Sequence, residues 1–156
     1  MFRLTILITM SMFINHSKLQ GSCEIVESDC EYYLCHEMQE PCGPKGYTLN
    51  FGYRYCLKYL NEDLYTNPGK SWLSQVRGCL QKSLSDQHPY PSCQDLKKEA
   101  INSHFDCYIN AGFCDLPRND QRRILRTAAN SILDPEVLKN GLAIIQECYK
   151  QGKIIW

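Results

Sequence analysis

The sequence predicts a small all-α, disulfide-rich domain of about four to five helices held together by five disulfides. Two observations lead to this prediction. Apolar residues recur at the spacing of amphipathic helices throughout the second half of the chain. In addition, ten cysteines all lie beyond residue 21. The length of 156 residues is typical of one domain.

The first 21 residues have the features of a secretory signal peptide. Arg3 supplies a positive start, Leu4–Ile14 is a mostly apolar run, and small or polar residues follow. The run is too short to cross a bilayer as a helix, and no later segment approaches the required apolar length. We therefore expect a signal peptide over 1–21 and a secreted, extracellular domain over 22–156 with no membrane span. The alternative is a buried N-terminal helix.

The charge balance argues against polyanionic partners. The chain has 17 basic and 17 acidic residues. Removal of the leader takes away Arg3 and Lys18 but no acidic residue, which leaves a net charge of about −2. Neither nucleic acid nor an anionic membrane surface is an expected partner.

The cysteines indicate a disulfide framework. They are Cys23, Cys30, Cys35, Cys42, Cys56, Cys79, Cys93, Cys107, Cys114 and Cys148. An even number in an exported chain predicts five bridges. A metal site is the weaker alternative, because no Cys-x-x-Cys pair occurs. We expect no metal and no cofactor.

Two helices are expected in the middle of the chain. The first follows Asn67-Pro68-Gly69 and carries Trp72, Val76, Cys79, Leu80 and Leu84 at helical spacing. Ser92 is a candidate N-cap for the second, which Gly112 ends. Its apolar face comprises Leu96, Ala100, Ile101, Phe105 and Tyr108.

Two more helices are expected at the C-terminal end. Pro117 opens the first, with Ile124, Leu125, Ala128 and Ile132 inward. Asp134-Pro135 is an N-cap followed by proline at the first helical position, and it opens the second. The inward stripe of this last helix comprises Val137, Leu138, Leu142, Ile145 and Cys148.

The short connection near Leu133-Asp134 predicts that the last two helices are antiparallel neighbours. If the two helices run back along each other from this turn, Cys148 lies opposite about residue 119, so a Cys114–Cys148 bridge would join the open end of the hairpin. The same pairing of positions, applied to the two middle helices, does not bring Cys79 and Cys107 opposite each other unless the register shifts. It says nothing about the N-terminal bridges.

One segment invites comparison with an enzyme. His104-Phe105-Asp106-Cys107-Tyr108 is similar to the helical His-Asp-x-Cys-Tyr of secreted phospholipases A2. Here, however, His104 and Asp106 are two residues apart, which on a helix turns them about 200° from each other. The double cysteine and the glycine-rich calcium loop of those enzymes are missing. We therefore expect a protein that is not an enzyme.

Two groups of residues are candidates for binding a partner. One is the aromatic set Tyr47, Phe51, Tyr53, Tyr55 and Tyr59, since tyrosine is favoured at interfaces. The alternative for this set is packing in a small core. The other is the basic set Arg122, Arg123 and Arg126, for which the alternative is a solvated helix face.

As a whole, the order and spacing of the ten cysteines resemble those of the stanniocalcins. Local similarity is highest in Tyr53-Arg54-Tyr55-Cys56-Leu57-Lys58-Tyr59-Leu60, in Gly69-Lys70 ahead of Cys79, and in Cys107-Tyr108-x5-Cys114. The resemblance covers about residues 23 to 148.

The resemblance implies the pairs Cys23–Cys35, Cys30–Cys56, Cys42–Cys93, Cys79–Cys107 and Cys114–Cys148. It also implies a secreted helical glycoprotein hormone. Vertebrate members act on calcium and phosphate balance and inhibit the pappalysin metalloproteases.

The chain departs from the family in three ways. The further C-terminal cysteine that links two family chains, the glycosylation sequon near the early cysteines and the long C-terminal tail are all missing. We expect no covalent dimer. The function expected from the sequence is that of a stanniocalcin-like hormone or signalling protein that binds an extracellular receptor or metalloprotease. The alternatives are an inhibitor or effector on the same scaffold and, least favoured, a phospholipase A2-like hydrolase.

Because five intrachain bridges consume all ten cysteines, we predict no free thiol and no interchain disulfide in the mature protein. Alkylation under denaturing, non-reducing conditions should add no label, and a non-reducing gel should show the mass of one mature chain. Two or more labelled cysteines, or a dimer that only reductant separates, would contradict the five-bridge framework.

Overall fold

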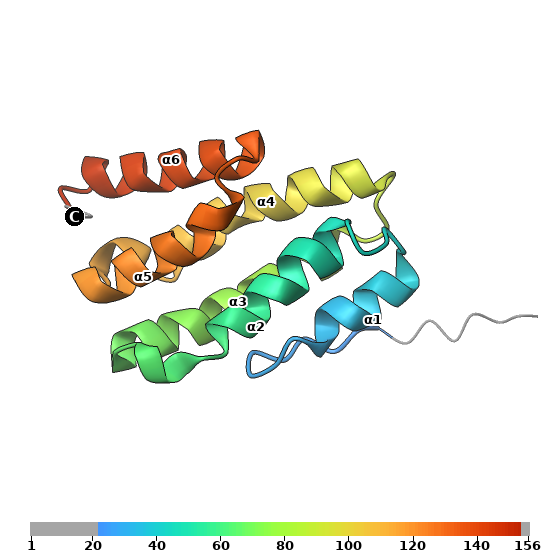
Figure 1. Cartoon of the computed structure of the whole chain (residues 1–156), viewed down its shortest axis with the longest axis horizontal. Coiled ribbons are helices and arrows are strands. Elements are labelled where there is room, and N and C mark those ends of the chain that lie inside the picture. Colours follow the sequence, from blue (N-terminus) through green and yellow to red (C-terminus); the bar gives the residue numbers. More distant parts are fainter. Residues whose placement is uncertain (1–21, 154–156) are drawn as a thin grey trace, which may run out of the picture.

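The computed structural model describes residues 22–153, and within this range all regular structure is helical (Figure 1). The α-helices are α1 (Glu31–Gln39), α2 (Arg54–Tyr59), α3 (Asn67–Gln87), α4 (Cys93–Asn110), α5 (Arg118–Ala128) and α6 (Pro135–Lys150). These helices and the five disulfides described below confirm the all-α, disulfide-rich fold class. The expected leader lies outside the described residues. None of the helices in this range has the length and apolar character needed to cross a membrane.

The helix signals in the second half of the chain are confirmed. The Ser92 hydroxyl accepts a hydrogen bond from the backbone N–H of Asp95, and the Asp134 carboxylate accepts from Glu136 and Val137. Asn67-Pro68-Gly69 forms the first turn of α3, with Thr66 as its cap. Capping side chains satisfy backbone donors that a helix start leaves unpaired, which is why these residues mark the boundaries.

The N-terminal half contains helices that the sequence analysis did not identify. One is α1, which lies at the edge of the molecule opposite α6 (Figure 1). The other is a continuous helical segment in which a π-helical stretch, Thr48–Tyr53, leads directly into α2. The segment that the sequence marked only by its aromatic residues is therefore part of the helical framework.

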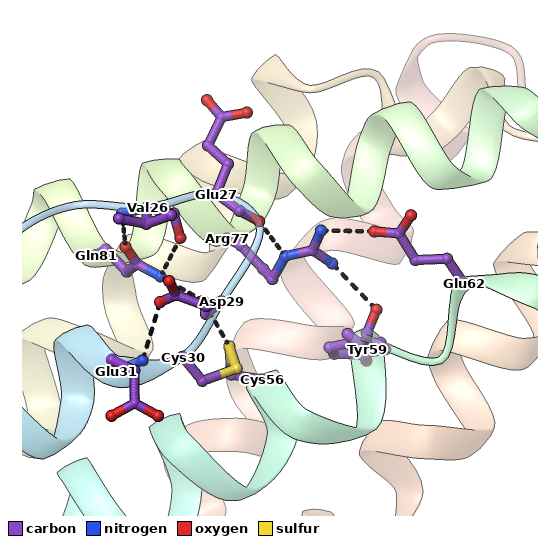
Figure 2. Close-up of a disulfide and its surroundings, with 10 residues drawn as sticks. All are labelled: Val26, Glu27, Asp29, Cys30, Glu31, Cys56, Tyr59, Glu62, Arg77 and Gln81. Carbon is purple, nitrogen blue, oxygen red and sulfur yellow. Dashed lines mark hydrogen bonds and ion pairs between the residues drawn. A yellow bond between two sulfur atoms is a disulfide. The ribbon is translucent and has the colours of Figure 1, made fainter.

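The segment before α1 has no regular structure and is held against α3 by two buried side chains (Figure 2). The Gln81 amide donates to the carbonyl oxygens of Val26 and Asp29, both at 3.1 Å, and its oxygen accepts from Val26 N–H at 2.9 Å. One turn earlier on α3, Arg77 donates to the Glu27 carbonyl oxygen at 2.5 Å. These bonds replace those that a helix or strand would provide.

The last two helices run in opposite directions, as the short connection predicted, but α5 is not the main packing partner of α6 (Figure 1). Helix α6 packs most extensively along α4, and the two run in the same direction (Figure 1). The Lys97–Asp134 ion pair, at 2.5 Å, joins their starts. At the other end, Cys114 follows α4 and bonds to Cys148 near the end of α6. The bridge therefore ties the end of α6 to the connection between α4 and α5, so it joins the open end of the pair α5 and α6 as expected and also anchors α6 beside the end of α4.

This placement corrects part of the expected inward stripe. Cys148 is buried and Val137 and Ile145 are half-buried, but Leu138 and Leu142 are 40% and 57% exposed, and Ile144, which the stripe left out, is buried. Ile132 is 51% exposed, since α5 ends at Ala128 and leaves it in the connection.

Five disulfides join parts of the chain that are distant in sequence. They are Cys23–Cys35, Cys30–Cys56, Cys42–Cys93, Cys79–Cys107 and Cys114–Cys148, with Cα separations of 5.2–5.9 Å. These are the pairs that the family resemblance implies. No cysteine of the described residues is free.

Replacing Cys114 and Cys148 by alanine should loosen α6 first. The bridge spans 34 residues, and its loss returns roughly 3–4 kcal/mol of entropy to the unfolded chain in the simple loop model. Because α6 carries no other disulfide, hydrogen exchange should rise over Pro135–Lys150 while α3 stays protected. Uniform loss of protection, or unchanged protection in α6, would contradict this assignment.

Candidate functional site

A large hollow on the described surface lies between α5 and the segment that leads into α3. It has a volume of about 740 Å³. It is lined by Lys58, Asp63, Leu64, Tyr65, Thr66, Asn119, Asp120, Arg122, Arg123, Arg126, Thr127 and Asn130. We call this hollow the basic groove, since all three arginines of the predicted basic set line it.

A buried carboxylate fixes the two walls of the basic groove to each other. Asp120, on the first turn of α5, is 1% exposed. It accepts hydrogen bonds from the Thr66 backbone N–H at 3.2 Å and from the Thr66 hydroxyl. Gly69 completes the contact, because a Cβ at this position would lie 2.5 Å from the Asp120 carboxylate. The start of α5 is thereby docked onto the start of α3.

The three arginines form the cationic wall of the basic groove. Arg122, Arg123 and Arg126 are exposed, and among residues 22–153 no carboxylate lies within 4.0 Å of any of their guanidinium groups. The guanidinium of Arg123 lies 5.7 Å from the centre of the Tyr65 ring, a cation–π distance that orients it. The wall therefore presents positive charge that no carboxylate of the described part of the chain pairs with.

Other lining residues keep the basic groove positive. Lys58 adds a fourth cation, with its ammonium 4.4 Å from the centre of the Tyr55 ring. Of the two lining carboxylates, Asp63 lies 4.0 Å from Lys70 and Asp120 is bound to Thr66. Burial raises the pKa of Tyr65, so its hydroxyl stays neutral at physiological pH. Four cations thus face two carboxylates that already have partners.

The aromatic set does not form a surface. Tyr47, Tyr55 and Tyr59 are buried, and Phe51 and Tyr53 are half-buried. Their rings belong to the core around α2. The packing alternative therefore describes this set, and its proposed role in binding a partner is corrected.

One member of the aromatic set contacts the helix that carries the basic set, since the Tyr59 hydroxyl donates to the Ile124 carbonyl oxygen of α5 at 3.4 Å.

The residues compared with a phospholipase do not form a catalytic pair. His104 Nδ1 lies 2.7 Å from the Ala100 carbonyl oxygen, and its ring meets Phe51 edge-on inside the protein. Burial lowers the pKa of His104 to about 4. Asp106 lies on the exposed side of the same helix. Within residues 22–153, no three His, Cys, Asp or Glu side chains are arranged to hold a metal ion.

Sequence reasoning missed Lys58, Tyr65, Thr66 and Asp120. Thr66 and Asp120 are 54 residues apart, and no local sequence pattern predicts that the carboxylate of Asp120 on α5 accepts a hydrogen bond from Thr66, the residue before α3. Lys58 is part of the quoted segment that resembles the stanniocalcins, but only the fold brings it to the arginines.

Replacing Asp120 by asparagine should lower the free energy of unfolding by roughly 1.5–3 kcal/mol, because a charged hydrogen-bond acceptor is lost from a buried site. Urea unfolding measures this as a lower midpoint with an unchanged slope. Asp63→Asn is the control, since the Asp63 side chain is 98% exposed and its loss should cost less than about 0.5 kcal/mol. Equal effects of the two variants would refute the structural role of Asp120.

Comparison of the chain with protein-family models, with curated proteins and with solved structures finds no match in any of the three.

Proposed function

We propose that this protein is a secreted, stanniocalcin-like signalling protein that acts by binding an extracellular protein and not by catalysis. The observation that carries the proposal is the basic groove, with its unpaired arginines on a rigid helix. The five disulfides support an oxidising, extracellular setting, because such a density of bridges is typical of small secreted domains. Calcium and phosphate balance is the physiological setting that the resemblance suggests.

The basic groove fits an acidic segment of the partner protein. Guanidinium groups bind carboxylates through paired, geometrically matched hydrogen bonds, which a lysine ammonium cannot reproduce. Arg122 and Arg126 lie one helical turn apart on α5 and so present two such groups along the groove. The hollow of about 740 Å³ provides room for several side chains of the partner.

A second candidate function uses the same groove. An extracellular metalloprotease or other enzyme that presents an acidic surface would be inhibited by the same contacts, and the protein would then be an inhibitor or effector. The two functions differ in the class of protein captured and in the effect of binding on it. A captured protease should lose activity when stoichiometric protein is added, whereas a receptor should signal.

Reversing the groove charges should weaken capture of the partner. The variant Arg122→Glu/Arg123→Glu/Arg126→Glu, immobilised and exposed to extracellular fluid, should retain the partner at least tenfold less than the wild type in quantitative mass spectrometry. Tenfold corresponds to 1.4 kcal/mol, or about 0.5 kcal/mol for each of three ion pairs. Wild-type capture should also fall as salt rises, because exposed ion pairs are screened.

The matched control is Lys45→Glu/Lys98→Glu/Lys139→Glu, which changes the net charge equally at exposed lysines outside the groove. It should capture the partner as the wild type does. If the two triple variants behave alike, or if the arginine variant captures the same proteins in the same amounts, then the basic groove is not the binding site.

A further inference from the structure

A second pocket, separate from the basic groove, lies between α1 and the chain that follows α3. Its volume is about 260 Å³. It is lined by Ser22, Cys23, Tyr32, His36, Gln39, Ser85 and His88. Two imidazoles face each other here, since the His36 and His88 rings are edge-on with centres 5.7 Å apart. We call it the histidine pocket.

Polar atoms without partners are concentrated in the histidine pocket and its immediate surroundings. The His36 ring is 1% exposed, yet neither of its nitrogens has a hydrogen-bond partner. The same holds, within the described residues, for His88 Nε2 and for one oxygen each of Glu37 and Glu40. Glu40 lies between the imidazoles, 3.9 Å from His36 Nε2 and 3.5 Å from His88 Nε2. A buried polar group normally has a partner, so this cluster calls for an explanation.

The surroundings hold His36 neutral. Burial lowers the pKa of His36, and the neighbouring His88 lowers it further, while Glu40 and Glu37 act in the opposite direction. Burial also raises the pKa values of Tyr32 and Tyr90, so these neighbours carry no charge near neutral pH. The titratable and charged groups that face the pocket are Tyr32 and Glu37 from α1, Glu40 directly after α1, Asp86 from the end of α3, and His88 and Tyr90 from the segment after α3.

We propose that the histidine pocket is a proton-sensitive latch, in which protonation of His36 releases α1 from the chain segment 85–90. The contacts that would open are identifiable. Tyr90 N–H donates to Glu40 Oε1 at 2.7 Å, and the His36 ring packs on His88 and Tyr90. The pocket between them gives solvent protons a route to the imidazole.

The direction of the switch follows from the state that binds more protons. In the closed latch His36 has a lowered pKa, whereas in the opened latch it regains its ordinary value near 6.5. The closed latch is therefore fully favoured above about pH 6.5 and loses stability as the pH falls below it. Opening stays local, because Cys23–Cys35 and Cys42–Cys93 tether α1 on both sides.

Hydrogen exchange at pH 7.5 and pH 5.0, corrected for the intrinsic pH dependence of exchange, tests the latch. In the wild type, protection over 32–40 and 85–90 should fall about tenfold at pH 5.0 relative to α5. In His36→Phe, which keeps an aromatic ring but cannot be protonated, protection there should be independent of pH. His88→Gln keeps the buried His36 imidazole and should retain the fall.

Other outcomes would overturn the proposal. The first is a wild type in which protection over 32–40 and 85–90 rises or stays constant at pH 5.0. The second is a fall in protection in His36→Phe as large as that in the wild type. The third is a His88→Gln variant in which protection does not fall. The lowered pKa of His104 also destabilises the folded state at pH 5.0, but His36→Phe keeps His104, so comparison of the two proteins separates the contributions of the two histidines. If His36→Phe does not fold, proton NMR of the wild type decides instead. The His36 ring should then titrate below its ordinary pKa together with amides of 85–90, and an ordinary or raised pKa would refute the latch.

Discussion

The fold depends on two polar side chains, Arg77 and Gln81, that α3 directs inward instead of toward water (Figure 2). A buried guanidinium is costly unless its donors are all used. Each of the three Arg77 nitrogens donates one hydrogen bond, to the carbonyl oxygens of Glu27 and Tyr59 and to the Glu62 carboxylate, at 2.5, 3.0 and 2.6 Å. One residue thereby connects the N-terminal segment, the end of α2 and the approach to α3. The Cys30–Cys56 disulfide joins the same segment to α2, so the covalent and polar constraints act on the same part of the chain.

This arrangement explains why the two halves of the chain differ in how far their structure can be predicted from sequence. The helices α3 to α6 have local signals, namely apolar periodicity and capping residues such as Ser92 and Asp134, and these signals predicted their positions. The N-terminal half is organised by pairs that are distant in sequence, such as Val26 with Gln81, 55 residues apart. Periodicity cannot predict such pairs, since each residue alone is an ordinary polar or apolar side chain. The same limit applies to Thr66 and Asp120 in the basic groove.

The basic groove is open because of how α5 is turned. Helix α5 is short, and its buried face is limited to Asp120, Gln121 and Ile124. Ile124, Leu125 and Ala128 lie on the side of α5 that shares a pocket with Ile144 of α6. The arginines lie on another side of α5, which neither α4 nor α6 covers. Electrostatic character at the groove is thus a consequence of helix packing, and the overall charge of the chain does not predict it.

Helix α6 shows why periodicity alone predicted an inner face that is only partly right: Cys148 is buried and Val137 and Ile145 are half-buried, whereas Leu138 and Leu142 are exposed. It carries two apolar stripes at helical spacing. One comprises Leu138, Leu142, Ile145 and Tyr149, and the other comprises Val137, Gly141, Ile144 and Cys148. The first contains the larger side chains and is favoured by hydrophobicity, yet three of its four members are exposed. The second faces the protein, with Ile144 and Cys148 buried and Val137 and Gly141 half-buried, because Cys148 must reach Cys114, and residues four, seven and eleven positions before Cys148 share its face. In α6 the cysteine therefore sets the centre of the inner face, with Ile144 in phase with it and Ile145 packed at its edge.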